Sequence, residues 1–122
     1  MSPPLLDKLL RLKQKSWRRR YSRHRADFHL RASALCEAGY LEIQGRCSDI
    51  GQGGMGTVLT AELAQGEVLS LVFALPSTTR PLAVRAIVRY RKGFVHGLEF
   101  LGLSPEQQTA IAAFCQRLER VD

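Results

Sequence analysis

Residues 49–56 read Asp-Ile-Gly-Gln-Gly-Gly-Met-Gly and contain four glycines within six positions. Glycine is used this densely where the backbone turns with positive φ, or where another group must approach the main chain closely. The segment that follows, 57–66, begins with two β-branched residues and ends at a glycine turn, which favours a strand over a helix. Residues 49–66 therefore predict a tight loop that leads into a β-strand.

Two nucleotide-binding loops share this glycine spacing, and both are excluded by their context. A dinucleotide-binding loop must open a helix, whereas a strand is expected here. A protein kinase needs a lysine on a nearby strand and two later catalytic motifs. The chain has lysines only at positions 8, 13, 15 and 92, and it lacks both later motifs. The glycine loop is therefore neither a dinucleotide-binding loop nor a kinase loop.

Six segments have the alternating or apolar composition of strands and are separated by short turns. They are 26–34, 40–44, 55–63, 68–75, 82–90 and 95–101. A parallel sheet would need crossover helices for which the turns leave no room, so antiparallel pairing is expected. The pattern predicts a mainly β domain, a six-stranded antiparallel barrel or a sandwich, and closure into a barrel would also remove exposed edges.

A helix is predicted at each end of the chain. Ser104-Pro105-Glu106-Gln107 is typical of a helix start and predicts a C-terminal helix over 105–120. Its apolar face should pack on the barrel and comprises Ala110, Ile111, Phe114, Cys115 and Leu118. Residues 1–17 predict a short amphipathic helix, with a stripe made by Leu5, Leu6, Leu9, Leu10 and Leu12. Such a basic stripe can lie on a membrane surface, but packing on its own domain or in a homodimer is expected here.

The composition indicates a cytoplasmic protein without a metal or cofactor. No run of 18 apolar residues exists, and the N-terminus lacks the apolar region of a secretory signal. The three cysteines are widely spaced, which favours reduced and mostly buried thiols; they are Cys36, Cys47 and Cys115. The three histidines have no metal-ligand spacing and no catalytic signature; they are His24, His29 and His96. An enzyme is therefore not expected.

The net charge of +7 belongs to the N-terminal arm. Residues 1–25 hold nine lysines and arginines against one aspartate, whereas the rest of the chain holds nine basic and ten acidic side chains. The body of the protein is thus near neutral, and residues 18–25 form an arginine-rich arm suited to an anion.

An arginine pair in this arm and the glycine loop follow one another in a characteristic order. Arg19-x-x-x-Arg23 precedes the first strand, and Asp49-x-Gly51-x-x-Gly54 comes about thirty residues later. In this order the chain resembles the PilZ family, bacterial receptors for cyclic di-GMP. The family's motifs are R-x-x-x-R and [D/N]-x-S-x-x-G, so Gly51 replaces a serine. Residues 97–100 and 103–107 are also similar to the family, and the resemblance covers residues 18–118.

The resemblance implies a PilZ-like barrel over residues 26–122 and a non-enzymatic cyclic di-GMP receptor. The ligand-binding residues that it implies are Arg18, Arg19, Arg20, Arg23, Asp49, Gly51 and Gly54. Arginine forks match phosphate and the O6/N7 edge of guanine, a carboxylate accepts from the guanine N–H edge, and glycine lets the ligand lie against backbone. Tyr21 or an arginine plane is suited to stack on a base.

Where the family has an arginine at position 18, the resemblance implies room for two stacked ligand molecules. The arm would order around the ligand and signal to an unidentified protein effector. Two alternatives stay open. One is a PilZ-like interaction module that has lost nucleotide binding, for which Gly51 is the main argument. The other is a basic-arm nucleic-acid binder on a small barrel, which the near-neutral barrel makes less favourable.

Overall fold

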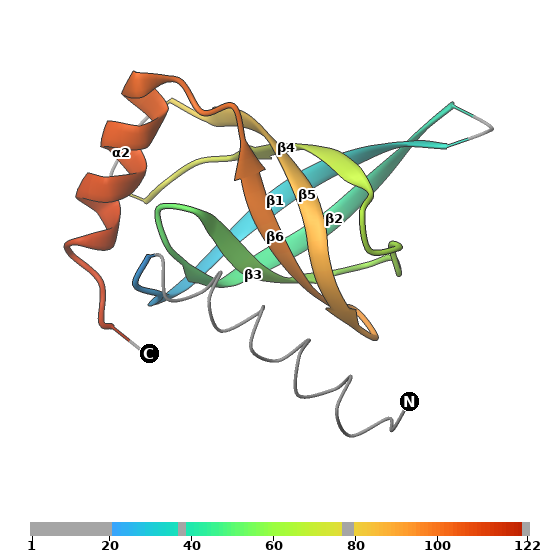
Figure 1. Ribbon diagram of the computed structural model, residues 1–122, viewed down its shortest axis with the longest axis horizontal. Coiled ribbons are helices and arrows are strands. Elements are labelled where there is room, and N and C mark those ends of the chain that lie inside the picture. Colours follow the sequence, from blue (N-terminus) through green and yellow to red (C-terminus); the bar gives the residue numbers. More distant parts are fainter. Residues whose placement is uncertain (1–20, 37–38, 77–79, 121–122) are drawn as a thin grey trace, which may run out of the picture.

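The computed structural model describes residues 21–36, 39–76 and 80–120. Within these ranges the chain forms six strands and one helix (Figure 1). The strands are β1 (His24–Cys36), β2 (Gly39–Ile50), β3 (Gly54–Leu59), β4 (Val68–Phe73), β5 (Leu82–Lys92) and β6 (Val95–Leu101), and the helix is α2 (Pro105–Cys115). No helix in the described ranges has the length and apolar character that crossing a bilayer requires.

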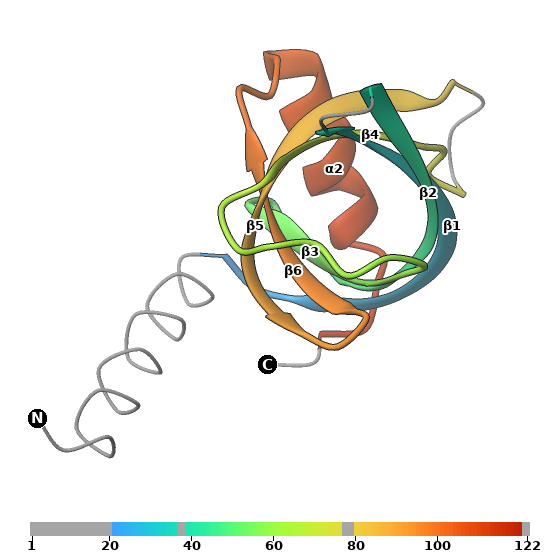
Figure 2. The same ribbon diagram turned by 90° about the vertical axis from the view of Figure 1, so that its right-hand side faces the viewer.

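The six strands close into an antiparallel barrel. Neighbours follow the order β1-β2-β3-β6-β5-β4, and β1 pairs with β4 to complete the ring. Figure 2 looks into the barrel from the end opposite α2, which lies across the far opening. The predicted β-barrel is confirmed, and the alternative of a sandwich is wrong.

The barrel core follows from the period-two pattern of its strands. Along β1, Phe28, Leu30, Ala32 and Ala34 are buried, and the residues between them face outward. Aromatic side chains join this core to α2, because the ring of Phe28 lies 5.5 Å from that of Phe73 and 6.0 Å from that of Phe114 on the helix. The described helix therefore shares one hydrophobic core with the barrel.

Helix α2 begins as the sequence predicts and ends earlier. The Ser104 hydroxyl accepts from the Gln107 N–H at 3.1 Å, and the Gln107 side chain accepts in return from the Ser104 N–H at 3.0 Å. The helix ends at Cys115 and not at residue 120. Beyond it, the Glu119 carbonyl accepts from the Arg25 N–H at 2.8 Å, and Arg120 forms an isolated bridge with His24. Residues 119 and 120 thus pair with the start of β1 in place of continuing the helix.

Several strand boundaries also differ from the prediction, and the largest difference is in β2, which continues to Ile50 and not to residue 44. Strand β1 begins at His24, so Arg25 belongs to the sheet and not to an irregular arm. Strand β3 ends at Leu59, four residues earlier than predicted. The chain turns inward there, because the buried ring of His96 accepts from the Leu63 N–H at 3.0 Å. The predicted helix over 1–17 lies outside the described residues.

Candidate functional site

The four glycines in the β2–β3 turn and the first residues of β3 serve close approach and not a left-handed turn. None of them has positive φ; the described glycines that do are Gly39, Gly66, Gly93 and Gly102. A Cβ at Gly51 would lie 2.5 Å from the Ser22 carbonyl oxygen, and one at Gly53 would lie 2.7 Å from the Tyr21 ring. A Cβ at Gly54 would meet the Leu98 carbonyl. The loop is therefore a surface on which the chain ahead of β1 packs.

A partly buried ion pair connects the two predicted motifs. Arg23 Nη1 donates to Asp49 Oδ1 at 2.9 Å, and the Arg23 side chain is 8% exposed against 33% for Asp49. Burying a guanidinium is costly unless a partner compensates its charge, and Asp49 supplies that compensation. Gly56 leaves room for the second carboxylate oxygen, since a Cβ there would lie 2.5 Å from Asp49 Oδ2. Arg23 thus fixes a carboxylate that stays one-third exposed.

The structure brings together four of the seven site residues that the sequence predicts. Arg23, Asp49, Gly51 and Gly54 meet where the start of β1 crosses the β2–β3 loop. The Gly51 N–H donates to the Gly54 carbonyl at 2.9 Å, which closes that loop. The other three predicted residues lie outside the described residues; they are Arg18, Arg19 and Arg20.

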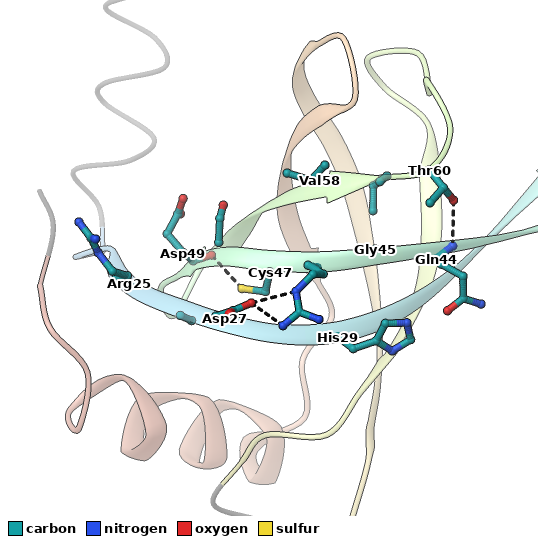
Figure 3. Close-up of a pocket in the computed structure, with 13 residues that line it drawn as sticks. Arg25, Asp27, His29, Gln44, Gly45, Cys47, Asp49, Val58 and Thr60 are labelled. Atoms are coloured by element: carbon teal, nitrogen blue, oxygen red, sulfur yellow. Dashed lines mark hydrogen bonds and ion pairs between the residues drawn. The ribbon is translucent and has the colours of Figure 1, made fainter.

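An open groove of about 820 Å³ extends from Asp49 along the outer face of β1, β2 and β3 (Figure 3). Arg25 and Asp49 are paired across β1 and β2 and stand together at one end of it. Further along, Arg46 donates from Nη2 to Asp27 Oδ1 at 2.6 Å, and His29 lies beyond them. The volume is within the range of small-molecule sites, about 300–1,000 Å³. A cation and an acceptor carboxylate side by side suit an anion that also carries an N–H edge.

Of the residues that line the groove, sequence reasoning predicted only Asp49 as a site residue, and it missed the basic side chains of Arg25, His29 and Arg46. Alternation along 26–34 correctly predicts that His29 faces outward. Only the register between β1 and β2 shows which residue of β2 lies beside it. His29 pairs with Arg46, and Arg46 pairs in turn with Val58 of β3. A surface formed by three strands cannot be predicted until the register between those strands is known.

Two buried thiols lie beneath the site. Cys47 Sγ contacts the Asp49 carbonyl at 3.2 Å, and Cys115 Sγ contacts the Ile50 carbonyl at 3.9 Å. Burial, aided by the charge of Asp49, raises the pKa of Cys47 far above its ordinary value, and burial raises that of Cys115 to about 11. Both thiols are free and buried, as predicted, and they stay protonated at neutral pH. Among the described residues no three side chains of metal-binding type cluster together.

Comparison with solved structures finds twelve matching chains, including the three that follow. The Bacillus subtilis inhibitor of motility, MotI/DgrA, shares 26% identity at a TM-score of 0.67, over 82% of this chain and 50% of that one. This chain thus spans half the length of the motility inhibitor. The PilZ domain of YcgR from Escherichia coli, solved with c-di-GMP, shares 20% identity at a TM-score of 0.64, over 83% of this chain and 91% of that one.

The PilZ domain of CeSA from a cellulose-synthesizing bacterium shares 13% identity at a TM-score of 0.61, over 78% of this chain and 95% of that one. These last two similarities concern the fold. No curated protein sequence matches the chain. The model of the PilZ domain matches residues 18–117, most of the sequence, and confirms the resemblance drawn from the two motifs. The chain belongs to the PilZ domain family.

Proposed function

We propose that the protein is a non-enzymatic receptor for cyclic di-GMP, held between the basic arm and the glycine loop. One observation carries the proposal: the Arg23–Asp49 ion pair joins the two motifs at the end of a groove of suitable size. The PilZ domain of YcgR, which has the same fold, was solved with c-di-GMP. That structure supports a ligand of the same kind here.

The exposed side of the Asp49 carboxylate is available to accept hydrogen bonds from the N1–H and N2–H₂ groups of a guanine. We assign the phosphates to the forks of Arg18, Arg19 and Arg20, and we add Arg25, whose side chain lines the groove beside Asp49. Gly51 and Gly54 provide backbone that a base or sugar can approach.

Arg23 is buried, so it can contact the ligand only if residues 21–23 leave the glycine loop. We infer that ligand binding drives this rearrangement, because the ligand would stabilise the arrangement in which more arginines contact it. Repositioning of the arm would then signal to a protein effector in the cytoplasm. Arg18 adds a cation to the arm, which favours two stacked ligand molecules in each chain.

The strongest alternative is an interaction module that has lost nucleotide binding. Gly51 favours it, since the space of the motif serine side chain is taken by the Ser22 carbonyl. A nucleic-acid binder is less favoured, because the charged groove contains ion-paired Asp27 and Asp49 alongside its cations.

Isothermal titration calorimetry with cyclic di-GMP tests the proposal. Wild-type protein should bind with a Kd of about 1 μM or tighter, about −8 kcal/mol, and with two ligands per chain. Asp49→Asn keeps the shape of the side chain and should lose at least about tenfold in affinity, because an amide has one acceptor oxygen in place of two and no longer compensates the charge of Arg23. Glu62→Gln is the matched control, because Glu62 is a carboxylate paired with an arginine, Arg91, outside the groove, and this variant should bind as wild type does.

Arg18→Ala should reduce the stoichiometry to one ligand per chain. No heat with wild-type protein would favour the interaction module. Binding of short oligonucleotides with a steep salt dependence, in place of cyclic di-GMP, would establish the nucleic-acid alternative.

A further inference from the structure

An exposed apolar patch lies beside the groove and is formed by Val58, Phe94 and Val95. They are 49%, 51% and 44% exposed. Val58 and Val95 are cross-strand partners in β3 and β6, and the Phe94 carbonyl accepts from the N–H of Leu59 at 2.9 Å. The side chains of Val58 and Val95 are therefore neighbours on the outer face, and Phe94 precedes Val95 at the β5–β6 turn. A partner that covered these exposed apolar side chains would remove them from water.

The patch lies close to the point where the described chain begins. Tyr21 packs on Gly53, and Val58 is five residues further along from Gly53, a distance of about 17 Å along a strand. Val58 also lines the groove that ends at Asp49 (Figure 3). A segment that covers the patch therefore also contacts Val58, which forms part of the ligand groove.

We propose that residues 5–16 of the same chain cover this patch as an amphipathic helix. Their sequence, Leu-Leu-Asp-Lys-Leu-Leu-Arg-Leu-Lys-Gln-Lys-Ser, places five leucines on one broad stripe. Twelve helical residues are about 18 Å long, which matches the distance from the start of the described chain to the patch. A tether of only residues 17–20 keeps the segment at high local concentration.

A second apolar surface lies out of reach of this segment. Leu35, Tyr40 and Leu41 are 70%, 77% and 44% exposed near the end of the β1–β2 hairpin, which projects beyond the barrel (Figure 1). Strand β1 covers about 40 Å between His24 and Cys36. Tether and helix together extend at most about 35 Å from Tyr21. The segment of the same chain therefore reaches the patch on β3 and β6 and cannot lie on the hairpin tip.

Docking of this segment would let ligand binding change which surface an effector can reach, and this step rests on the proposed function. A ligand in the groove and the docked segment compete for the surface around Val58. The arginines of the tether that contact the ligand also move the tether away from the position that docking requires. Ligand binding therefore releases the leucine stripe, which becomes the surface that an effector binds.

Limited digestion with a lysine-specific endoproteinase, which leaves the arginines of the tether intact, followed by mass spectrometry, tests the docking through the cleavage rate at Lys8, Lys13 and Lys15. Val95→Glu places a charge in the patch and should speed cleavage at these lysines by about tenfold. Val68→Glu is the matched control, since Val68 is 49% exposed on β4, away from β3 and β6, and should be cut at the wild-type rate. The emission of Trp17, the chain's single tryptophan, should shift to the red only in Val95→Glu.

Phe94→Ser provides the same test if Val95→Glu does not fold. Cleavage of both patch variants at the wild-type rate would overturn the proposal. So would equal acceleration by Tyr40→Ser, or protection that grows with protein concentration, which would identify a second copy as the occupant.

Cyclic di-GMP added to wild-type protein should raise the cleavage rate to that of Val95→Glu. If calorimetry shows binding and the lysines stay protected, the coupling is refuted. If the ligand does not bind while Val95→Glu still accelerates cleavage, the proposed function fails and the docking of residues 5–16 is supported.

Discussion

The contact between Gly51 and Ser22 predicts that a side chain at position 51 destabilises the protein. A Cβ there would lie 2.5 Å from the Ser22 oxygen, whereas ordinary contacts begin at 3.4 Å. The Ser22 backbone would have to move by about 1 Å, and overpacking of this kind costs about 1–3 kcal/mol. Replacing glycine also stiffens the unfolded chain, which offsets about 0.4–1 kcal/mol. The expected net loss is about 0.5–2 kcal/mol.

Urea unfolding, followed by circular dichroism, measures this loss in Gly51→Ala and Gly51→Ser. Both variants should lose a similar amount, because the Cβ makes the clash and the hydroxyl does not. Gly53→Ala is the control and should lose less, since its Cβ meets the Tyr21 ring, a side chain that can rotate away. If Gly51→Ala is as stable as wild type, Ser22 does not pack on the glycine loop.

Two further predictions concern buried groups. His96 accepts from the Leu63 N–H at 3.0 Å and hydrogen-bonds the Phe94 carbonyl through Nδ1 at 2.8 Å. His96→Phe should therefore lower the free energy of unfolding in urea by about 1–3 kcal/mol and speed hydrogen exchange at the Leu63 amide. An unchanged unfolding midpoint would contradict this prediction. Burial raises the pKa of Cys47 and Cys115 above that of unfolded thiols, so ionisation favours the unfolded chain as pH rises past the ordinary thiol pKa. The free energy of unfolding should fall between about pH 8 and about pH 10, and by less in Cys47→Ala; an equal fall in both proteins would disprove the role of the thiol.

Local pattern was sufficient to predict six antiparallel strands and the start of the C-terminal helix, but it left a barrel and a sandwich as alternatives until the β1–β4 pairing was known. Alternation in 26–34 and 82–90 fixed which side chains enter the core, and short turns left antiparallel pairing as the sole option. The helix face was also predictable, because the spacing of Ile111, Phe114 and Cys115 depends on helical geometry alone. All three are buried against the barrel.

The environment of the site depends on contacts between distant segments, so the sequence could not predict it. Arg23 was expected in an irregular arm, but it is buried because Ser22 packs on Gly51, a contact made across almost thirty residues. The glycines allowed two interpretations, turn or close approach, and only their backbone angles decide between them. The early end of β3 follows from a bond between Leu63 and His96, which no local pattern encodes.

Nuclear magnetic resonance of the ¹⁵N-labelled protein, titrated with cyclic di-GMP, tests most directly whether the ligand sits at the junction of Arg23 and Asp49. The amide signals of Tyr21–Arg25 and Asp49–Gly56, and the side-chain Nε–H signal of Arg23, should all shift. Their shifts should reach their plateau at the same ligand concentration. Signals from Val68–Phe73 on β4 should stay in place, because that strand neither lines the groove nor contacts the loop. Shifts centred on β4, or no shifts at all, would contradict the account.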